Sequence, residues 1–160
     1  MKYLLSSEAR CKGFARIVSE LQLTGRVLVL DTKTRWNSTH KMLSTAYIYR
    51  TVWPRYAEEN PAFLHYVPEM YEWDMVADIC EFLEVFVDVT NIISGTSYPT
   101  CNLFLAEMYR VKILLDKNSE NEDKPHLKEL ATEMKLKYDK YWSQSNLLIS
   151  LGAVLDPRYY

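Results

Sequence analysis

The chain is poor in glycine and has no long apolar run, and each shortage excludes a class of protein. Four glycines among 160 residues suit a helical protein better than a loop-rich β-protein. No apolar stretch is long enough to span a bilayer. The first residues turn polar at Ser6 and charged at Glu8, so they do not form a signal peptide. We therefore expect a helical protein without a membrane partner.

Cysteine and histidine are also scarce, and their spacing excludes the common metal and catalytic motifs. None of the three cysteines lies in a C-x-x-C pair, and the three histidines are scattered along the chain. The odd number of cysteines, without a secretion signal, indicates reduced thiols. The sequence also lacks G-x-S-x-G, G-x-x-x-x-G-K, G-x-G-x-x-G and H-E-x-x-H. We therefore predict no catalytic residue, no metal ligand and no cofactor for this chain.

Charge is distributed unevenly around a net charge of −2. The segment from Arg26 to Arg55 carries six basic residues and one acid, Asp31, whereas the segment from Tyr56 to Tyr109 carries ten acids and no Lys or Arg. A basic segment with interleaved aromatics is compatible with a nucleic-acid face, although it also fits an ordinary solvated surface. The aromatics in question are Trp36, Tyr47, Tyr49, Trp53 and Tyr56.

Apolar periodicity predicts a mainly α-helical fold with one short β-strand. The run Val27–Leu30 is predicted as a buried strand. Pro54 should kink or end the second helix, and Asn146 should open a separate last one. The expected helices cover approximately residues 8–21, 39–53, 71–94, 100–115, 125–142 and 147–155.

We interpret the polar stretch that follows the predicted strand, Asp31–Thr39, as the segment around which the chain is organised. Asn37 and Ser38 are good N-cap residues for the next helix, which leaves Arg35 and Trp36 on a tight connection. Recognition residues are often presented on such loops. The same pair also fits a packed tryptophan beside a surface arginine, and an Asp in this position commonly caps a turn.

Four blocks of this sequence together resemble the hAT superfamily of DNA transposases. The segment Leu30–Thr39 resembles the superfamily's Arg-Trp motif. Three further blocks resemble the plant, RICESLEEPER-like branch, whose members carry an N-terminal BED zinc finger. They are Ser94–Leu103 with its Y-P-T-x-N, Lys137–Trp142 with K-Y-D-K-Y-W, and Ala153–Tyr159 with A-V-L-D-P-R-Y.

The resemblance implies a fragment of an RNase H-like transposase fold. Such transposases have an RNase H-like core interrupted by a large helical insertion. Residues 1–36 would form the end of this core, with a helix, the short strand and the Arg-Trp loop, and residues 37–160 would form a truncated part of the helical insertion.

The resemblance also implies where DNA would bind. Trp36 would stack on a base next to the cleavage point, and Arg35 would contact phosphate or orient the loop. The candidate DNA-binding residues are Arg35, Trp36, Lys33, Asn37 and Lys41.

None of the family's catalytic carboxylates can be matched here, and Asp31 belongs to the Arg-Trp motif instead. We therefore expect a nuclear, DNA-binding fragment that is not an enzyme by itself. A divalent metal is expected only for a full-length family member, and this chain or another transposase chain could be a second partner. The alternative is a helical protein-interaction module without DNA binding, which would use the acidic segment to bind a basic surface.

Overall fold

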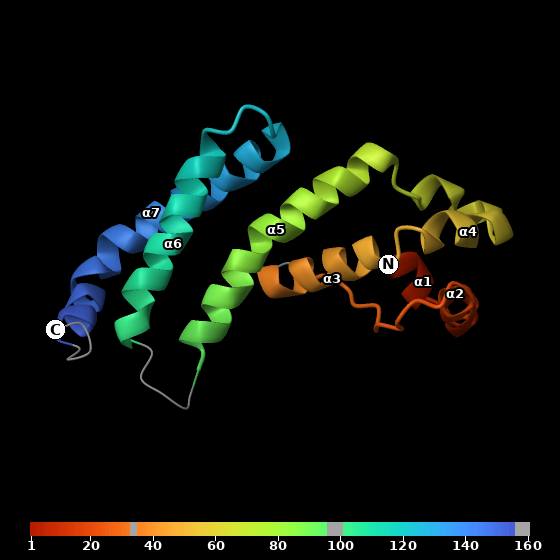
Figure 1. The fold of residues 1–160 in the computed structure, drawn as a ribbon, viewed down its shortest axis with the longest axis horizontal. Helices are drawn as coiled ribbons and strands as arrows, with labels where there is room; N and C mark the ends of the chain where they lie inside the picture. The colour runs from red at the N-terminus through yellow and green to blue at the C-terminus, as the bar shows by residue number, and fades with distance from the viewer. Residues whose placement is uncertain (33–34, 96–100, 156–160) are drawn as a thin grey trace. The chain divides into compact units, whose positions relative to one another are not determined.

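The computed structural model describes residues 1–32, 35–95 and 101–155, and every regular element in these ranges is helical. The prediction of a mainly α-helical fold is confirmed. Within these ranges the chain forms seven α-helices and one 3-10 helix, and Figure 1 draws their course along the chain. They are α1 (Lys2–Leu5), α2 (Glu8–Glu20), α3 (Trp36–Ile48), α4 (Val52–Glu59), η1 (Pro61–Tyr66), α5 (Met70–Ile93), α6 (Cys101–Ser119) and α7 (Pro125–Val154).

The chain divides into two compact units, Met1–Leu83 and Glu84–Tyr160. The division falls inside α5, so this helix contributes its first part to one unit and its last part to the other. Within the described residues, no helix is both long and apolar enough to cross a bilayer.

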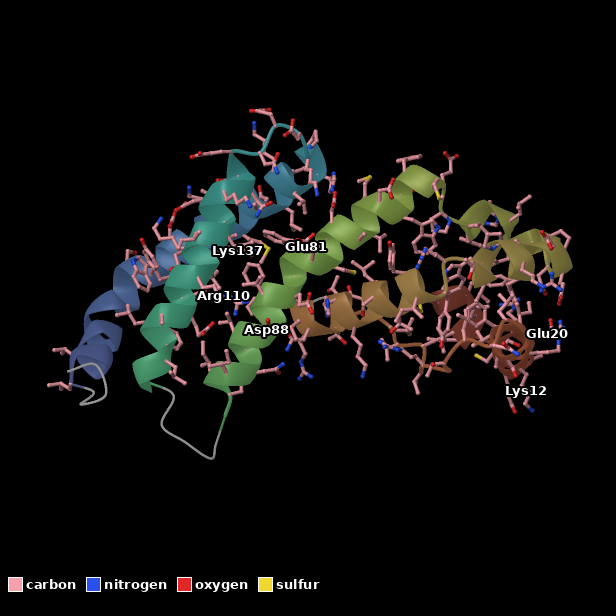
Figure 2. All side chains as sticks on the ribbon, viewed as in Figure 1. Lys12, Glu20, Glu81, Asp88, Arg110 and Lys137 are labelled. Atoms are coloured by element: carbon pink, nitrogen blue, oxygen red, sulfur yellow. The ribbon has the colours of Figure 1, made fainter. Side chains whose placement is uncertain are left out.

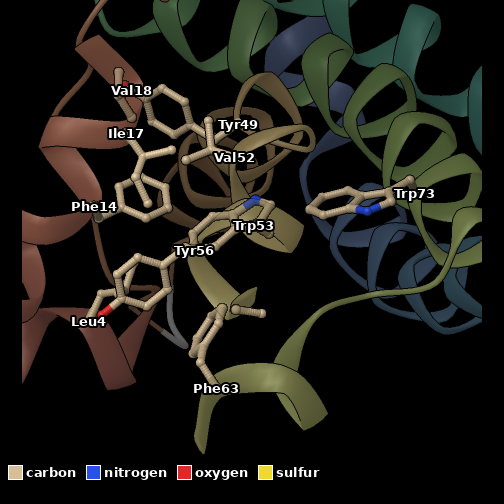
Figure 3. Packing of buried hydrophobic residues seen from close by; sticks show 11 residues of the cluster. Leu4, Phe14, Ile17, Val18, Tyr49, Val52, Trp53, Tyr56, Phe63 and Trp73 are labelled. Atoms are coloured by element: carbon tan, nitrogen blue, oxygen red, sulfur yellow. The ribbon is translucent and has the colours of Figure 1, made fainter. Parts of the chain in front are cut away.

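The core of the first unit is built mainly from aromatic side chains (Figure 3). The Phe14 ring on α2 lies 4.7 Å from the Trp53 ring and 5.7 Å from the Tyr56 ring, both on α4. The Trp53 indole N–H donates a hydrogen bond of 2.9 Å to the carbonyl of Ala46, which satisfies its buried polar atom. Each aromatic pair of this kind contributes about 0.5–1.5 kcal/mol beyond its buried area. The cluster therefore fixes α4 against α2.

Helix α2 ends in a Schellman motif centred on a residue other than glycine. Gln22 has φ of 54°, which is the left-handed region. The N–H of Leu23 donates to the carbonyl of Val18, and the N–H of Gln22 donates to the carbonyl of Ser19. Leu23 packs against the aromatic core just after this turn. The chain therefore turns at Gln22, before the Thr24-Gly25 pair.

The predicted strand Val27–Leu30 is wrong, because the described residues contain no strand. Val27 is 81% exposed and Leu30 is 48% exposed, whereas Leu28 packs partly against the core. A strand needs a neighbour that accepts and donates its backbone hydrogen bonds, and the described part of the chain offers none. The hydroxyl of Tyr49 instead accepts a hydrogen bond from the N–H of Arg26 and holds the start of this segment.

The predicted helix over residues 39–53 is divided into α3 and α4. The break falls at Tyr49–Thr51, several residues before Pro54. Pro54 lies in the first turn of α4, where its missing N–H would have no helical partner anyway. The prediction that Pro54 kinks or ends the second helix is therefore wrong in position, although the predicted helix is interrupted a few residues earlier.

In the second unit, α6 and α7 pack as a helical hairpin. Tyr138 on α7 donates a hydrogen bond of 2.8 Å to the carbonyl of Met108 on α6. Asp116 on α6 forms ion pairs of 2.7 Å with Lys112 and 2.6 Å with Lys135, so it also joins the two helices. The hydrogen bonds from Lys112 and then Lys135 lower the pKa of Asp116.

Helix α7 is continuous, so the predicted separate helix opening at Asn146 is wrong. Asparagine is neither proline nor glycine and can be accommodated inside a helix at a modest cost in propensity. Pro125 is the first residue of α7, as predicted. Figure 2 labels the exposed pair Arg110 and Asp88 of the same unit, whose charged atoms lie 3.5 Å apart.

Candidate nucleic-acid interface

The predicted motif forms a hydrogen-bonded turn at the start of α3. We call its described residues, Asp31, Thr32 and Arg35–Thr39, the Arg-Trp turn. The Arg35 N–H donates to the Thr32 carbonyl at 2.8 Å, and the Ser38 N–H donates to the Arg35 carbonyl at 2.9 Å. The Asp31 carboxylate accepts the hydroxyl hydrogen of Thr39 at 2.6 Å. The turn is therefore held by side chains that lie on both sides of Arg35.

The Ser38 hydroxyl lies at the centre of this turn. Its oxygen accepts the N–H of Thr32 at 2.8 Å. Its single hydrogen can be donated to the Arg35 carbonyl at 2.7 Å, to the Thr32 carbonyl at 3.1 Å or to Asp31 at 3.1 Å. Ser38 therefore ties the segment before the turn to the first turn of the helix.

The helix begins at Trp36, earlier than predicted, so the assignment of Asn37 or Ser38 as N-cap is wrong. Arg35 is the N-cap residue and makes no side-chain capping hydrogen bond. The physical reason is that the Ser38 hydroxyl bonds backward, to residues of the turn, and this lets the backbone become helical two residues before Ser38.

Four of the five candidate DNA-binding residues lie in the described part of the chain: Arg35, Trp36 and Asn37 at the start of α3, and Lys41 one helical turn further along it. Arg35 and Lys41 are exposed, and Trp36 is 49% exposed. Asn37 lies one helical turn before Lys41, so the two share a face, and its buried Oδ1 atom accepts no hydrogen bond within the described part of the chain. Lys33, the fifth candidate, lies outside the described residues.

The other aromatics of the basic segment do not join this surface. Tyr49, Trp53 and Tyr56 are buried in the aromatic core, at 1%, 3% and 1% exposure. The Tyr47 ring lies under the Arg50 guanidinium at 4.7 Å. The prediction of interleaved aromatics on a nucleic-acid face is therefore wrong for the three core residues, whose spacing reflects helix packing. Trp36 is the exposed aromatic of this set.

Of the three other blocks, Lys137–Trp142 lies wholly within the described residues and the remaining two only in part. In the Lys137–Trp142 block, the rings of Tyr138 and Trp142 stack at 5.8 Å, and Tyr138 contacts α6, so these aromatics pack the hairpin. The Tyr98–Thr100 part of one block and residues 156–159 of another lie outside the described residues. Among described residues, no group of three or more His, Cys, Asp and Glu side chains could hold a metal ion.

Two protein-family models match this chain. The model of the ZBED1 RNase-like helical domain matches residues 1–82, and the model of the hAT-like transposase, RNase-H fold, matches residues 102–160. No solved structure matches the chain. The helical fold and these matches define a protein of the transposase-derived class.

Curated plant proteins give the same result. RICESLEEPER 2, a zinc finger BED domain-containing protein of Oryza sativa subsp. japonica, is 29% identical over 99% of this chain and 22% of its own length. The putative AC transposase of Zea mays is 33% identical over 96% of this chain and 19% of its own length. The chain belongs to the hAT superfamily of transposases. It spans about a fifth of the length of these relatives.

The division at residue 36 between the end of an RNase H-like core and a helical insertion stays a prediction.

Proposed function

We propose that this chain is the DNA-contacting segment of a hAT-type transposase and that the start of α3 makes the contact. The observation that carries the proposal is the exposed pair Arg35 and Trp36, held by the hydrogen bonds of the Arg-Trp turn in a chain of this superfamily. A hydrogen-bonded turn that presents a cation beside an aromatic ring suits an unstacked base next to a phosphate.

Each candidate side chain has a distinct role in this proposal. Trp36 stacks on an unpaired base, a contact that is worth roughly 1–3 kcal/mol per base. Arg35 and Lys41 contact phosphates, which makes binding depend on salt. Asn37 supports the contact from the same helix face as Lys41, and Lys33 adds positive charge ahead of the helix.

We also propose what the chain does with DNA and where in the cell it acts. The chain binds DNA in the nucleus but does not cleave it, because none of its carboxylates can be assigned to the catalytic set of the superfamily. Strand cleavage and its divalent metal belong to a full-length member, with which this chain or a second transposase chain would associate.

The proposal is tested with the 160-residue chain and two fluorescent DNA probes. One is a hairpin, and the other is a duplex with a single unpaired 2-aminopurine, whose fluorescence reports stacking. We expect Trp36→Ala to weaken binding to the unpaired-base probe roughly 5-fold or more and to abolish the change in fluorescence. We expect Arg35→Ala to weaken binding to both probes and to reduce the salt dependence by about one phosphate contact.

Two exposed residues away from the Arg-Trp turn provide matched controls. Arg55→Ala removes an exposed arginine of α4, and Tyr71→Ala removes an exposed aromatic of α5. Both should bind DNA as the parent chain does. If Arg35→Ala and Trp36→Ala bind both probes as tightly as the parent, the proposed DNA contact is refuted.

A specific observation also favours the second candidate function, a protein-interaction module. Four large apolar side chains lie exposed close together in sequence where η1 leads into α5, and we call them the η1–α5 surface: Leu64, Tyr66, Met70 and Tyr71. Acids flank them in a segment that lacks Lys and Arg from residue 56 to residue 109. Exposed apolar side chains flanked in sequence by acids suit a partner that presents apolar side chains among basic ones.

This candidate is tested by calorimetric titration with an amphipathic Leu/Lys helical peptide, with a Leu/Glu peptide of the same pattern as control. Salt-sensitive binding of the Leu/Lys peptide that is lost in the double variant Met70→Ala, Tyr71→Ala would support it. Equal binding of both peptides, or of parent and variant, would exclude it.

A further inference from the structure

An aspartate at a DNA-contacting helix end requires an explanation. Asp31 is the one acid of the basic segment, and it lies beside the residues proposed to contact phosphate. A carboxylate in such a position repels the DNA backbone and should weaken binding. We therefore expect the Asp31 side chain to have another property that compensates for this repulsion.

The hydrogen bonds of Asp31 supply that property. One oxygen of its carboxylate, Oδ1, accepts the Thr39 hydroxyl at 2.6 Å and lies 3.1 Å from the Ser38 hydroxyl. These partners lie seven and eight residues further along the chain, in the first turns of α3. The carboxylate therefore joins the two sides of the segment that carries Arg35 and Trp36.

We propose that Asp31 is a positioning residue for DNA binding, which acts as a hydrogen-bond acceptor for the Thr39 hydroxyl and not through its charge. By closing the Arg-Trp turn before DNA arrives, it keeps Arg35 and Trp36 in one arrangement. DNA then does not have to order them. The inference rests on the proposed DNA-binding function of this helix end.

The acceptor role and the charge of Asp31 are separated by two substitutions. Asp31→Asn keeps an Oδ1 acceptor in the same place and removes the charge, whereas Asp31→Ala removes both. We expect Asp31→Ala to weaken binding to the unpaired-base probe about 3- to 10-fold, which corresponds to the loss of one ordinary hydrogen bond. We expect Asp31→Asn to bind at least as tightly as the parent chain, because it retains the acceptor and no longer repels phosphate.

A third variant removes the other side of the same hydrogen bond. Thr39→Val keeps the branched shape and deletes the hydroxyl, so it should weaken binding in the same range as Asp31→Ala. The double variant Asp31→Ala, Thr39→Val should lose little more than either single variant, because both remove one interaction. The matched controls are Thr132→Val, whose hydroxyl bonds only to the Lys128 carbonyl within α7, and the exposed Asp74→Ala on α5.

The outcomes distinguish this inference from the function on which it rests. If Arg35→Ala and Trp36→Ala lose DNA binding but Asp31→Ala does not, the positioning role is refuted and the DNA contact stands. Equal weakening by Asp31→Asn and Asp31→Ala would show that the charge is what matters, and would also overturn the inference. If no variant changes DNA binding, the proposed function itself fails. Thermal unfolding of each variant shows whether it is still folded. If Asp31→Asn binds DNA as the parent does while a folded Asp31→Ala binds more weakly, the loss comes from positioning and not from unfolding.

Discussion

The hydroxyl of Tyr138 should hold the α6–α7 hairpin together until it ionises. The side chain is 8% exposed, and its O–H donates to the Met108 carbonyl at 2.8 Å. Tyr138→Phe keeps the ring and its stacking on Trp142 and deletes this one bond. Met108 lies inside α6, where its carbonyl can still accept a helical N–H, so no buried acceptor is left without a partner. We therefore expect a loss of about 0.5–1.5 kcal/mol at neutral pH.

The effect of pH on this difference follows from the ionisation of the phenol. Burial, and then the nearby charges of Asp139 and Asp116, raise the pKa of Tyr138 to about 12. The folded chain therefore holds the phenolic proton more tightly than the unfolded chain, whose pKa is 10.0. This contribution to stability is complete below pH 10 and is lost as the pH rises toward 12. After allowance for solvent screening, the parent should lose about 1–2 kcal/mol more than Tyr138→Phe over this range.

Thermal unfolding followed by far-UV circular dichroism measures both effects. At neutral pH the melting temperature of Tyr138→Phe should lie about 2–5 °C below that of the parent, and the gap should close or reverse above pH 10. Tyr109→Phe, which alters an exposed tyrosine of α6, should follow the parent at every pH. A gap that stays constant across the titration would refute the assignment of the raised pKa to this buried hydroxyl.

Two further perturbations test other parts of the structure. Gln22→Gly should stabilise the first unit by about 0.5–1 kcal/mol in urea unfolding, because glycine adopts the left-handed conformation at the end of α2 without steric cost. An unchanged or lower unfolding midpoint would contradict this prediction. Asp116→Asn should lower stability at neutral pH, because the pKa of this carboxyl is lowered by Lys112 and Lys135 and its contribution is present above the unfolded-state pKa. The difference from the parent should disappear as the pH falls through the folded-state pKa, and a gap that persists in acid would show that charge is not the cause.

Sequence reasoning located the helices well where local chemistry decides them. Helix α5 was expected at about residues 71–94 and spans Met70–Ile93, and Pro125 opens α7 as expected. The interruption between α3 and α4 was assigned to Pro54 because proline is the strongest local signal. Its position near Tyr49 is set by tertiary contacts, since this buried ring packs on Phe14 and its hydroxyl binds Arg26. Such contacts leave no trace in periodicity.

The error at Val27–Leu30 has a different origin. A short apolar run has no period that separates a buried strand from an extended segment, and the strand prediction also requires a neighbouring strand. The structure places this run in irregular coil, and Leu28 packs partly against the core. The sequence shows that such a run is apolar, but its conformation depends on whether a neighbouring strand is present to pair with it.

The sequence motif located the candidate site, whereas the roles of its individual residues follow from the hydrogen bonds in the structure. Ser38 was expected to cap the helix forward and instead bonds backward, to Thr32 and Arg35. Asp31 was assigned to the motif and, as an alternative, to the cap of a turn, but its partner Thr39, eight residues away, cannot be inferred from an isolated carboxylate. Once those contacts are known, the motif divides into residues whose side chains hydrogen-bond within the turn, Asp31, Ser38 and Thr39, and residues proposed to contact DNA, Arg35 and Trp36. This division predicts that substitutions at Asp31 or Thr39 act on DNA only through Arg35 and Trp36, so that in a chain already carrying Trp36→Ala and Arg35→Ala they should have no further effect on binding.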